Sequence, residues 1–166
     1  MVCRRCKTVK HNLSEEEFAR LAVVEIPDGV LGNIHQFKNF DPSRIVHYEL
    51  KEDSLLLYME EVKRLEAMLE FRSTIEAFRY EVERGVRPEV EVFSSFEYTE
   101  DFSVLTFTVD RTEYEQDITA EMIELSITED AIKYQIYSRK PIAVEVRYKD
   151  STTNQIFEQR TYPEPR

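Results

Sequence analysis

The sequence predicts an α+β fold, in which a short N-terminal helix and one long helix pack on a C-terminal antiparallel β-meander of about five or six strands. Two patterns support this prediction. Apolar residues recur at helical spacing over residues 54–84, and they alternate with polar residues over residues 89–162. The period changes between Gly85 and Pro88. Because no linker rich in Pro, Gly or Ser interrupts the 166 residues, we expect a single domain over residues 1–166.

The first helix is expected after a basic N-terminal segment, residues 1–13, which we expect to be flexible. Ser14 and Glu17 have the spacing of a capping box, in which hydroxyl and carboxylate satisfy two free backbone amides. The turn sequence that begins at Pro27 should end this helix. Phe18, Leu21 and Ala22 should form the apolar face of this helix, and Glu25 should lie on the same face one turn later.

The next segment, residues 30–43, contains Gly, Asn and Asp-Pro signals and predicts a connecting loop. Ile34, Phe37 and Phe40 are its candidate apolar anchors. Residues 44–50 follow with the composition of a strand.

The long helix is predicted over residues 54–84, with Asp53 or Ser54 as its N-cap and Gly85 as its left-handed C-terminal residue. A helix of that length spans about 45 Å, whereas a compact domain of this size has a radius of gyration of about 15 Å. Length and heptad spacing together favour a homodimer through this helix, with a simple core stripe as the alternative. The candidate self-association residues are Leu55, Tyr58, Val62, Leu65 and Leu69.

The C-terminal half predicts a sheet that is wet on one face, because apolar and polar residues alternate in short runs. The runs cover residues 89–98, 104–109, 122–127, 132–137, 142–149 and 155–162. Short connections between them favour antiparallel neighbours. The long helix is the only predicted element large enough to cover the dry face.

The net charge of −11 is concentrated in one stretch, since residues 88–132 carry thirteen acids against Arg111 alone, which gives −12. Such a field repels nucleic acid, so direct nucleic-acid binding is not expected, and a basic protein partner is favoured. The hypothesis includes a nucleic-acid mimic, in which carboxylates stand where phosphates would. The candidate partner-binding acids are Glu89, Glu91, Glu97, Asp110, Glu113, Glu115, Asp117 and Glu124.

The same acids have two other interpretations. A solvated sheet face would also place Glu and Asp at alternate strand positions, where they keep the protein soluble. A divalent cation could be bound by the group Asp110, Glu113, Glu115 and Asp117, although these residues have neither the glycine nor the ligand order of a calcium loop.

A Cys-x-x-Cys near the N-terminus, formed by Cys3 and Cys6, has the spacing of half a zinc site when taken with His11. A fourth ligand is missing locally, and only His35 or His47 could return to supply it. The alternative is a frayed basic segment with two reduced thiols. No other cofactor is indicated.

No catalytic or phosphate-binding motif is present, and no apolar run approaches the roughly 20 residues of a membrane span. The sequence therefore predicts a cytoplasmic, non-enzymatic protein-interaction or assembly module that self-associates and uses an acidic β surface to bind a basic macromolecule. The alternative is a small ligand-binding or catalytic domain with a pocket between the long helix and a curved sheet. Its candidate lining is Phe93, Phe96, Phe107, Tyr134 and Tyr148.

Overall fold

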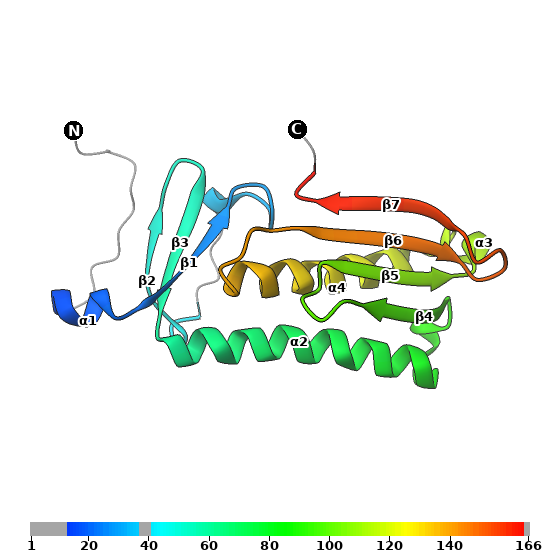
Figure 1. The fold of residues 1–166 in the computed structure, drawn as a ribbon, viewed down its shortest axis with the longest axis horizontal. Coiled ribbons are helices and arrows are strands. Elements are labelled where there is room, and N and C mark those ends of the chain that lie inside the picture. Colours follow the sequence, from blue (N-terminus) through cyan, green and yellow to red (C-terminus); the bar gives the residue numbers. More distant parts are fainter. Residues whose placement is uncertain (1–12, 37–40, 165–166) are drawn as a thin grey trace. The chain divides into compact units, whose positions relative to one another are not determined.

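The computed structural model describes residues 13–36 and 41–164, which form a mixed α+β fold with one long helix and two sheets (Figure 1). The predicted fold class is confirmed. The chain forms two compact units. Unit 1 comprises the residues up to Met68 together with Ile136–Lys140, and unit 2 comprises Leu69–Gln135 and the residues from Pro141 onward.

Unit 1 contains a three-stranded antiparallel sheet in the order β1-β3-β2. Its elements are helix α1 (Glu15–Ala19), strand β1 (Ala22–Pro27), the 3-10 helix η1 (Ile34–Gln36), strand β2 (Ile45–Leu50) and strand β3 (Ser54–Met59). The predicted capping box is confirmed, since the Glu17 amide donates to Ser14 Oγ at 3.2 Å and the Ser14 amide to Glu17 Oε2 at 2.9 Å. The strand expected at 44–50 is also confirmed as β2.

The first helix ends earlier than expected, because Ala22 begins strand β1. Ala22, Val24 and Ile26 are buried, while Val23 and Glu25 between them are exposed. This alternation fits a strand with one buried face, paired along its whole length with β3. The expectation that Leu21, Ala22 and Glu25 continue a helical face was wrong.

The long helix α2 spans Glu61–Arg84. The expected start of this helix near Ser54 was wrong, because strand β3 occupies the first six residues of the predicted helix. Residues 54–59 form β3, which is hydrogen-bonded on both sides and buried along most of its length. A strand in that position is apolar on both faces, and it therefore lacks the alternation that marks a half-exposed strand.

The expected C-terminal signal of α2 is confirmed at Gly85, which has a φ of +58°. The Val86 amide donates to the Glu81 carbonyl at 3.3 Å and the Gly85 amide to the Val82 carbonyl at 3.4 Å. These two bonds form a Schellman motif, which satisfies two carbonyls that the helix leaves free.

Unit 2 contains a four-stranded sheet in the order β4-β5-β6-β7. Its strands are β4 (Phe93–Tyr98), β5 (Val104–Val109), β6 (Val144–Asp150) and β7 (Ile156–Tyr162), and the 3-10 helix η2 (Pro88–Val90) precedes them. The strands expected near 104–109, 142–149 and 155–162 are confirmed, whereas the first begins at Phe93 rather than at residue 89. β4 pairs with β5 and β6 with β7 in antiparallel fashion, but β5 and β6 are parallel.

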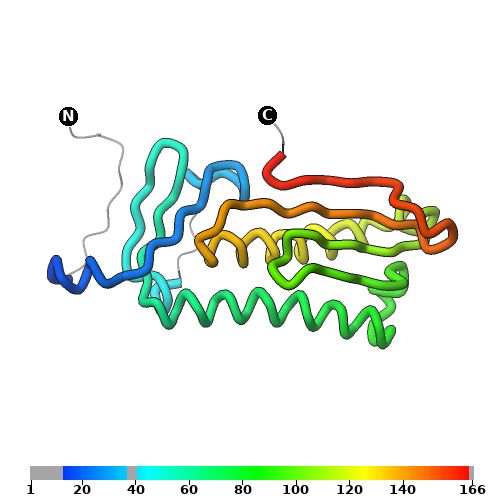
Figure 2. Tube along the Cα trace, viewed as in Figure 1, coloured from blue at the N-terminus to red at the C-terminus, as the bar shows by residue number. Residues whose placement is uncertain are grey.

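The two strands expected at 122–127 and 132–137 do not form, because residues 118–137 are a single helix, α4 (Ile118–Tyr137). A one-turn helix, α3 (Arg111–Tyr114), precedes it. The chain between β5 and β6 therefore passes through α3 and α4, as the trace in Figure 2 shows. A crossover of this kind is what parallel neighbouring strands require, so the predicted continuous meander was wrong at this point.

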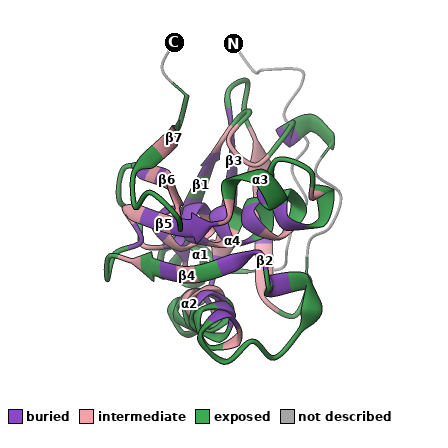
Figure 3. Ribbon diagram, turned by 90° about the vertical axis from the view of Figure 1, so that its right-hand side faces the viewer, coloured by how far each residue is buried: buried purple, intermediate pink, exposed green. Residues whose placement is uncertain are grey.

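The core of unit 2 is aromatic. Phe78 of α2 meets Phe93 and Phe96 of β4 edge-on, with ring centroids 5.3 and 5.0 Å apart, and Phe96 lies 4.7 Å from Phe107 of β5. Along α2, buried residues follow one side of the helix and exposed residues the other (Figure 3).

Candidate functional site

The candidate partner-binding acids occupy several kinds of element rather than one sheet face. Glu89 lies in η2, Glu91 follows it, and Glu97 lies on β4. Glu91 and Asp110 come to the same end of the sheet, because the Asp110 amide donates to the Val92 carbonyl at 3.4 Å. Glu97 lies near the other end of β4, where it pairs with Thr106 of β5.

The acids around α3 and α4 have local structural roles. The Oδ1 atom of Asp110 accepts a hydrogen bond from the Glu113 amide at 3.1 Å, and Glu115 pairs with Arg111 at 2.8 Å. Asp117 caps the first turn of α4, since its Oδ1 accepts from two amides at 2.9 and 3.1 Å. Within the described part of the chain, no group of three or more His, Cys, Asp or Glu side chains could hold a metal ion.

Glu124 was expected on an exposed acidic face, and this expectation was wrong because its side chain is 0% exposed. It projects from the inward side of α4, and Thr128 Oγ1, one turn later, donates to its Oε1 at 3.2 Å. Tyr148 of β6 and Tyr114 of α3 are also buried. Among the described residues, neither Glu124 Oε2 nor either tyrosine hydroxyl has a hydrogen-bond partner.

Burial shifts the pKa values of Glu124 and Tyr114. Burial raises the pKa of the Glu124 carboxyl, and the positive charge of Arg160 opposes this rise. Burial, with the charge of Glu124, also raises the pKa of Tyr114 to about 12. Arg160 of β7 lies 5.1 Å from the centre of the Tyr148 ring and pairs with Glu158 at 2.7 Å. The sequence contains no signal for this buried group, because a surface glutamate on a half-exposed strand or helix would also have apolar neighbours in sequence, as Glu124 does.

A groove in unit 2 lies between α2 and α4 and has a volume of about 470 Å³. Small side chains of α2, including Ser73, Thr74 and Ala77, form one wall, and Ile123 and Ser126 of α4 form the other. Phe78, Glu81, Arg87 and Ile127 complete the lining. Arg87 and Glu81 form an ion pair across part of it.

Beside this groove, α4 exposes an apolar ridge, which we define as Ile118, Met122 and Leu125. Their side chains are 76%, 66% and 43% exposed. The spacing i, i+4, i+7 places them on one face of the helix, opposite the face that carries Ala120, Ile127 and Ala131, all buried. The sequence pattern placed Leu125 and Met122 on alternate faces of the strand expected at 122–127, and Ile118 was not considered.

The predicted self-association residues divide between two elements. Leu55 and Tyr58 lie on β3, where Leu55 is buried, so these two do not extend a helical stripe. Val62, Leu65 and Leu69 lie on α2 and are 53%, 47% and 63% exposed. Tyr58 instead donates a hydrogen bond from its hydroxyl to Glu49 Oε2 at 3.1 Å.

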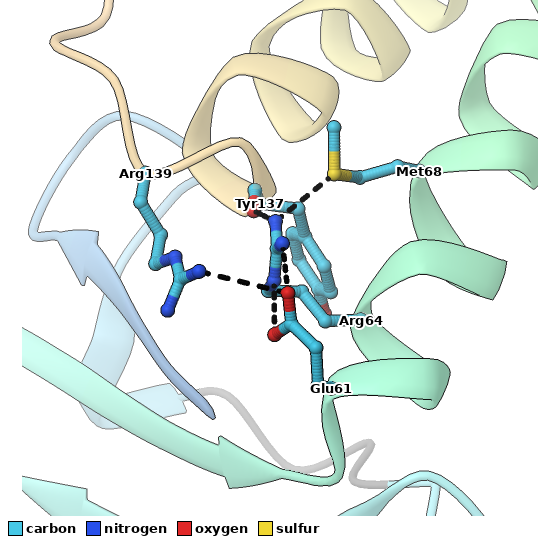
Figure 4. Close-up of polar contacts among 5 residues, drawn as sticks. All are labelled: Glu61, Arg64, Met68, Tyr137 and Arg139. Carbon is cyan, nitrogen blue, oxygen red and sulfur yellow. Dashed lines mark hydrogen bonds and ion pairs between the residues drawn. The ribbon is translucent and has the colours of Figure 1, made fainter. Parts of the chain in front are cut away.

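A polar cluster in unit 1 surrounds Arg64 of α2, which is buried (Figure 4). Its guanidinium pairs with Glu61 at 2.5 Å and donates to the Tyr137 carbonyl at 2.5 Å and to Met68 Sδ at 3.2 Å. Arg139 approaches Glu61 at 3.6 Å. Tyr137 is the last residue of α4, so this cluster stabilises a helix end and has a structural role.

The candidate zinc ligands Cys3, Cys6 and His11 lie outside the described residues. His47, considered as a fourth ligand, is buried and contacts the rings of Phe18 and Tyr58, at centroid distances of 5.3 and 5.2 Å. His35 lies in η1 and is exposed.

The aromatic residues proposed to line a ligand pocket mostly fill the core of unit 2. Phe93, Phe96, Phe107 and Tyr148 are buried, and their rings contact one another or Phe78. Tyr134 is half-buried and accepts a hydrogen bond from Arg72 at 3.0 Å.

No protein-family model, curated protein sequence or solved structure gives a significant match to the chain. No helix in the described ranges is long and apolar enough to cross a membrane. We therefore infer the function from the arrangement of the described side chains.

Proposed function

We propose that this chain is a cytosolic, non-enzymatic protein-interaction module, and that unit 2 binds a partner protein on the apolar ridge and groove of α4. The observation that carries this proposal is the exposure of Ile118, Met122 and Leu125 on a single helix face. Contiguous exposed apolar side chains on a small protein often mark an interaction surface.

The energetics favour a binding role for these side chains. Burying a side chain of this size stabilises a complex by about 1.5–3 kcal/mol, before the cost of association is subtracted. Three anchors on one ridge, next to a groove, resemble the central cluster that dominates the affinity of protein interfaces.

Charge around the ridge supports the expected basic partner. Residues 112–132 contain seven acids and no lysine or arginine: Glu113, Glu115, Asp117, Glu121, Glu124, Glu129 and Asp130. All except the buried Glu124 are exposed or half-exposed. A field of one sign accelerates association with a partner of the opposite sign. The acidic surface that we propose is thus helical, and it replaces the β surface that the sequence suggested.

The experiment that tests this proposal is a comparative affinity capture with the full chain. Wild-type protein, M122D and I156D are each immobilised, and bound proteins from the native host are quantified by mass spectrometry. Ile156 is a matched control, because it is a half-exposed apolar residue of unit 2 that lies on β7 rather than on the ridge of α4. We expect partners that bind wild type and I156D but not M122D. A set of captured proteins identical for all three would contradict the proposal.

Self-association through α2 is a second part of the proposal. The specific observation is that Val62, Leu65 and Leu69 remain exposed at the spacing of a heptad stripe. Helix α2 carries six acids and five bases, so like-charge repulsion between two copies of this helix is small. The first two members of the original five-residue set are not included, because they lie on β3.

A further inference from the structure

We infer that the segment bound in the groove of unit 2 is an amphipathic helix of a partner protein, with an apolar stripe flanked by lysine or arginine. This inference rests on the proposed function, and it specifies the shape and charge of the bound segment. Three features of the site lead to it: the walls of the groove, the surrounding charge and the poor fit of other occupants.

The walls of the groove suit a helix. Ser73, Thr74 and Ala77 line it on the α2 side, and such small side chains let another helix approach closely. α2 and α4 run in opposite directions along the groove (Figure 1), so it extends parallel to two helix axes. A third helix laid between them would meet Ile123 and Ser126 on its other side and Phe78 at the base.

The backbone of the groove excludes an added strand. Strand addition needs unpaired amides and carbonyls at a sheet edge, whereas both walls here are helices whose backbone groups are bonded within the helix. Recognition of a helix in a groove instead uses apolar anchors at i, i+3, i+4 and i+7. The ridge residues Met122 and Leu125 are exposed on α4, next in sequence to the lining residues Ile123 and Ser126.

Charge specifies cationic flanks on the bound helix. Glu121 and Glu129 are exposed on α4, and Glu129 continues the line of the ridge one turn after Leu125. Lys133 lies 3.8 Å from Glu129 and 3.6 Å from Asp130, so it offsets only part of this charge. The Arg87–Glu81 pair in the lining is neutral as a whole.

The same charges disfavour a second copy of this chain as the occupant. Two α4 surfaces facing each other would bring together the exposed Glu121 and Glu129 of both copies, with Lys133 as the only base of each helix. Phosphate groups of a nucleic acid or an anionic membrane would be repelled for the same reason.

The test is an NMR titration of the ¹⁵N-labelled full chain with designed 18-residue helical peptides. One peptide carries leucine at i, i+3, i+4 and i+7 spacing with lysine at all flanking positions, and a matched peptide carries glutamate in place of lysine. We expect the lysine peptide to bind, with the largest shift changes at the amides of Ala77, Ile123 and Ser126. M122D should weaken binding at least about tenfold, because it removes an exposed apolar anchor that the peptide would cover and leaves a carboxylate to be desolvated in its place.

Controls make the outcomes decisive. I156D should bind the lysine peptide like wild type, and the affinity should fall as salt rises. If M122D does not give a folded spectrum, A77W replaces it, since a large ring at position 77 would occupy the groove without changing charge. Equal binding of the glutamate peptide, or shift changes spread away from the groove, would overturn the inference.

The inference and the proposed function can fail separately. If partner capture depends on Met122 but the lysine peptide does not bind, the interaction module stands and the helical, cationic ligand is wrong. If sedimentation shows a dimer of wild type that is lost in M122D, the occupant is a second copy and the inference is wrong.

Discussion

The guanidinium of Arg64 in α2 donates a hydrogen bond to the carbonyl oxygen of Tyr137, the last residue of α4, at 2.5 Å. The two residues are 73 positions apart in sequence. The last carbonyls of a helix have no partner within it, and a cation at that end also interacts favourably with the helix dipole. Arg64 therefore provides both a donor and a charge where α4 needs them.

Replacing Arg64 by methionine should lower the free energy of unfolding by roughly 1–3 kcal/mol, because the buried carbonyl of Tyr137 loses its donor. Urea denaturation followed by circular dichroism measures this change. K63M is the matched control, since Lys63 pairs with Glu66 at 2.9 Å on the exposed side of the same helix, and its loss should change stability by at most about 0.5 kcal/mol. Equal effects of the two substitutions would show that the carbonyl contact adds nothing.

The segment that sequence reasoning misread most completely is α4. Its Ile and Thr residues have high strand propensity, and Ile123, Leu125 and Ile127 alternate with less apolar neighbours. Helical periodicity was hidden because the ridge places apolar residues on the outward face as well as on the inward one. The capping residue Asp117 was the signal that could have revealed the helix, since its carboxylate binds the amides of Thr119 and Ala120.

Local signals predicted the ends of elements better than their middles. The capping box at Ser14 and the left-handed Gly85 were both recognised, because each depends on one or two residues and a fixed backbone geometry. Strand β3 was missed because its burial comes from two neighbouring strands that are distant in sequence. The candidate site shares this limit: the acidity of residues 112–132 was visible, but the helix that displays it was not.

Alanine at Gly85 should destabilise the protein by roughly 1 kcal/mol, because a residue with a Cβ atom is strained at the left-handed φ of +58°. In the described part of the chain, no atom outside the immediate backbone neighbours of Gly85 lies within 4 Å of the position that this Cβ would take, so the cost comes from the backbone conformation. Asparagine tolerates the left-handed region better, and G85N should therefore lose less stability than G85A. Thermal and urea unfolding of the three proteins check this order, and an unchanged stability of G85A would refute it.

Glutamine in place of Glu124 should stabilise the protein at neutral pH. Burial raises the pKa of this carboxyl above its ordinary value of 4.5, so the folded state holds the proton more tightly than the unfolded state. The free energy of unfolding of wild type should consequently fall as pH rises from about 4.5 through the folded pKa. E124Q carries no titrating group at this position and escapes that loss.

Urea unfolding of wild type and E124Q between pH 4 and pH 8 measures this effect. The advantage of E124Q should be smallest at the acidic end, grow with pH and then level off. E121Q is the control, because Glu121 lies on the exposed side of the same helix. A difference between E124Q and wild type that stays constant with pH would mean that the carboxyl is ionised and compensated in the folded state.

Self-association through α2 gives the last prediction. If the exposed stripe of Val62, Leu65 and Leu69 forms a dimer seam, the chain should sediment at twice its 19.8 kDa mass at tens of micromolar. Burying these three side chains in both copies would provide the apolar contact that a helix pair needs. L65D should then convert the dimer to a monomer, because it places a charge in the seam of each copy.

M122D is the control for this experiment, since it places the same charge on α4 instead of α2. It should remain dimeric if α2 is the seam. Analytical ultracentrifugation of wild type, L65D and M122D distinguishes the cases: a monomeric wild type refutes the dimer, and a dimer that survives L65D places the seam away from this stripe. A dimer lost only in L65D would leave the groove of each unit 2 free for its partner.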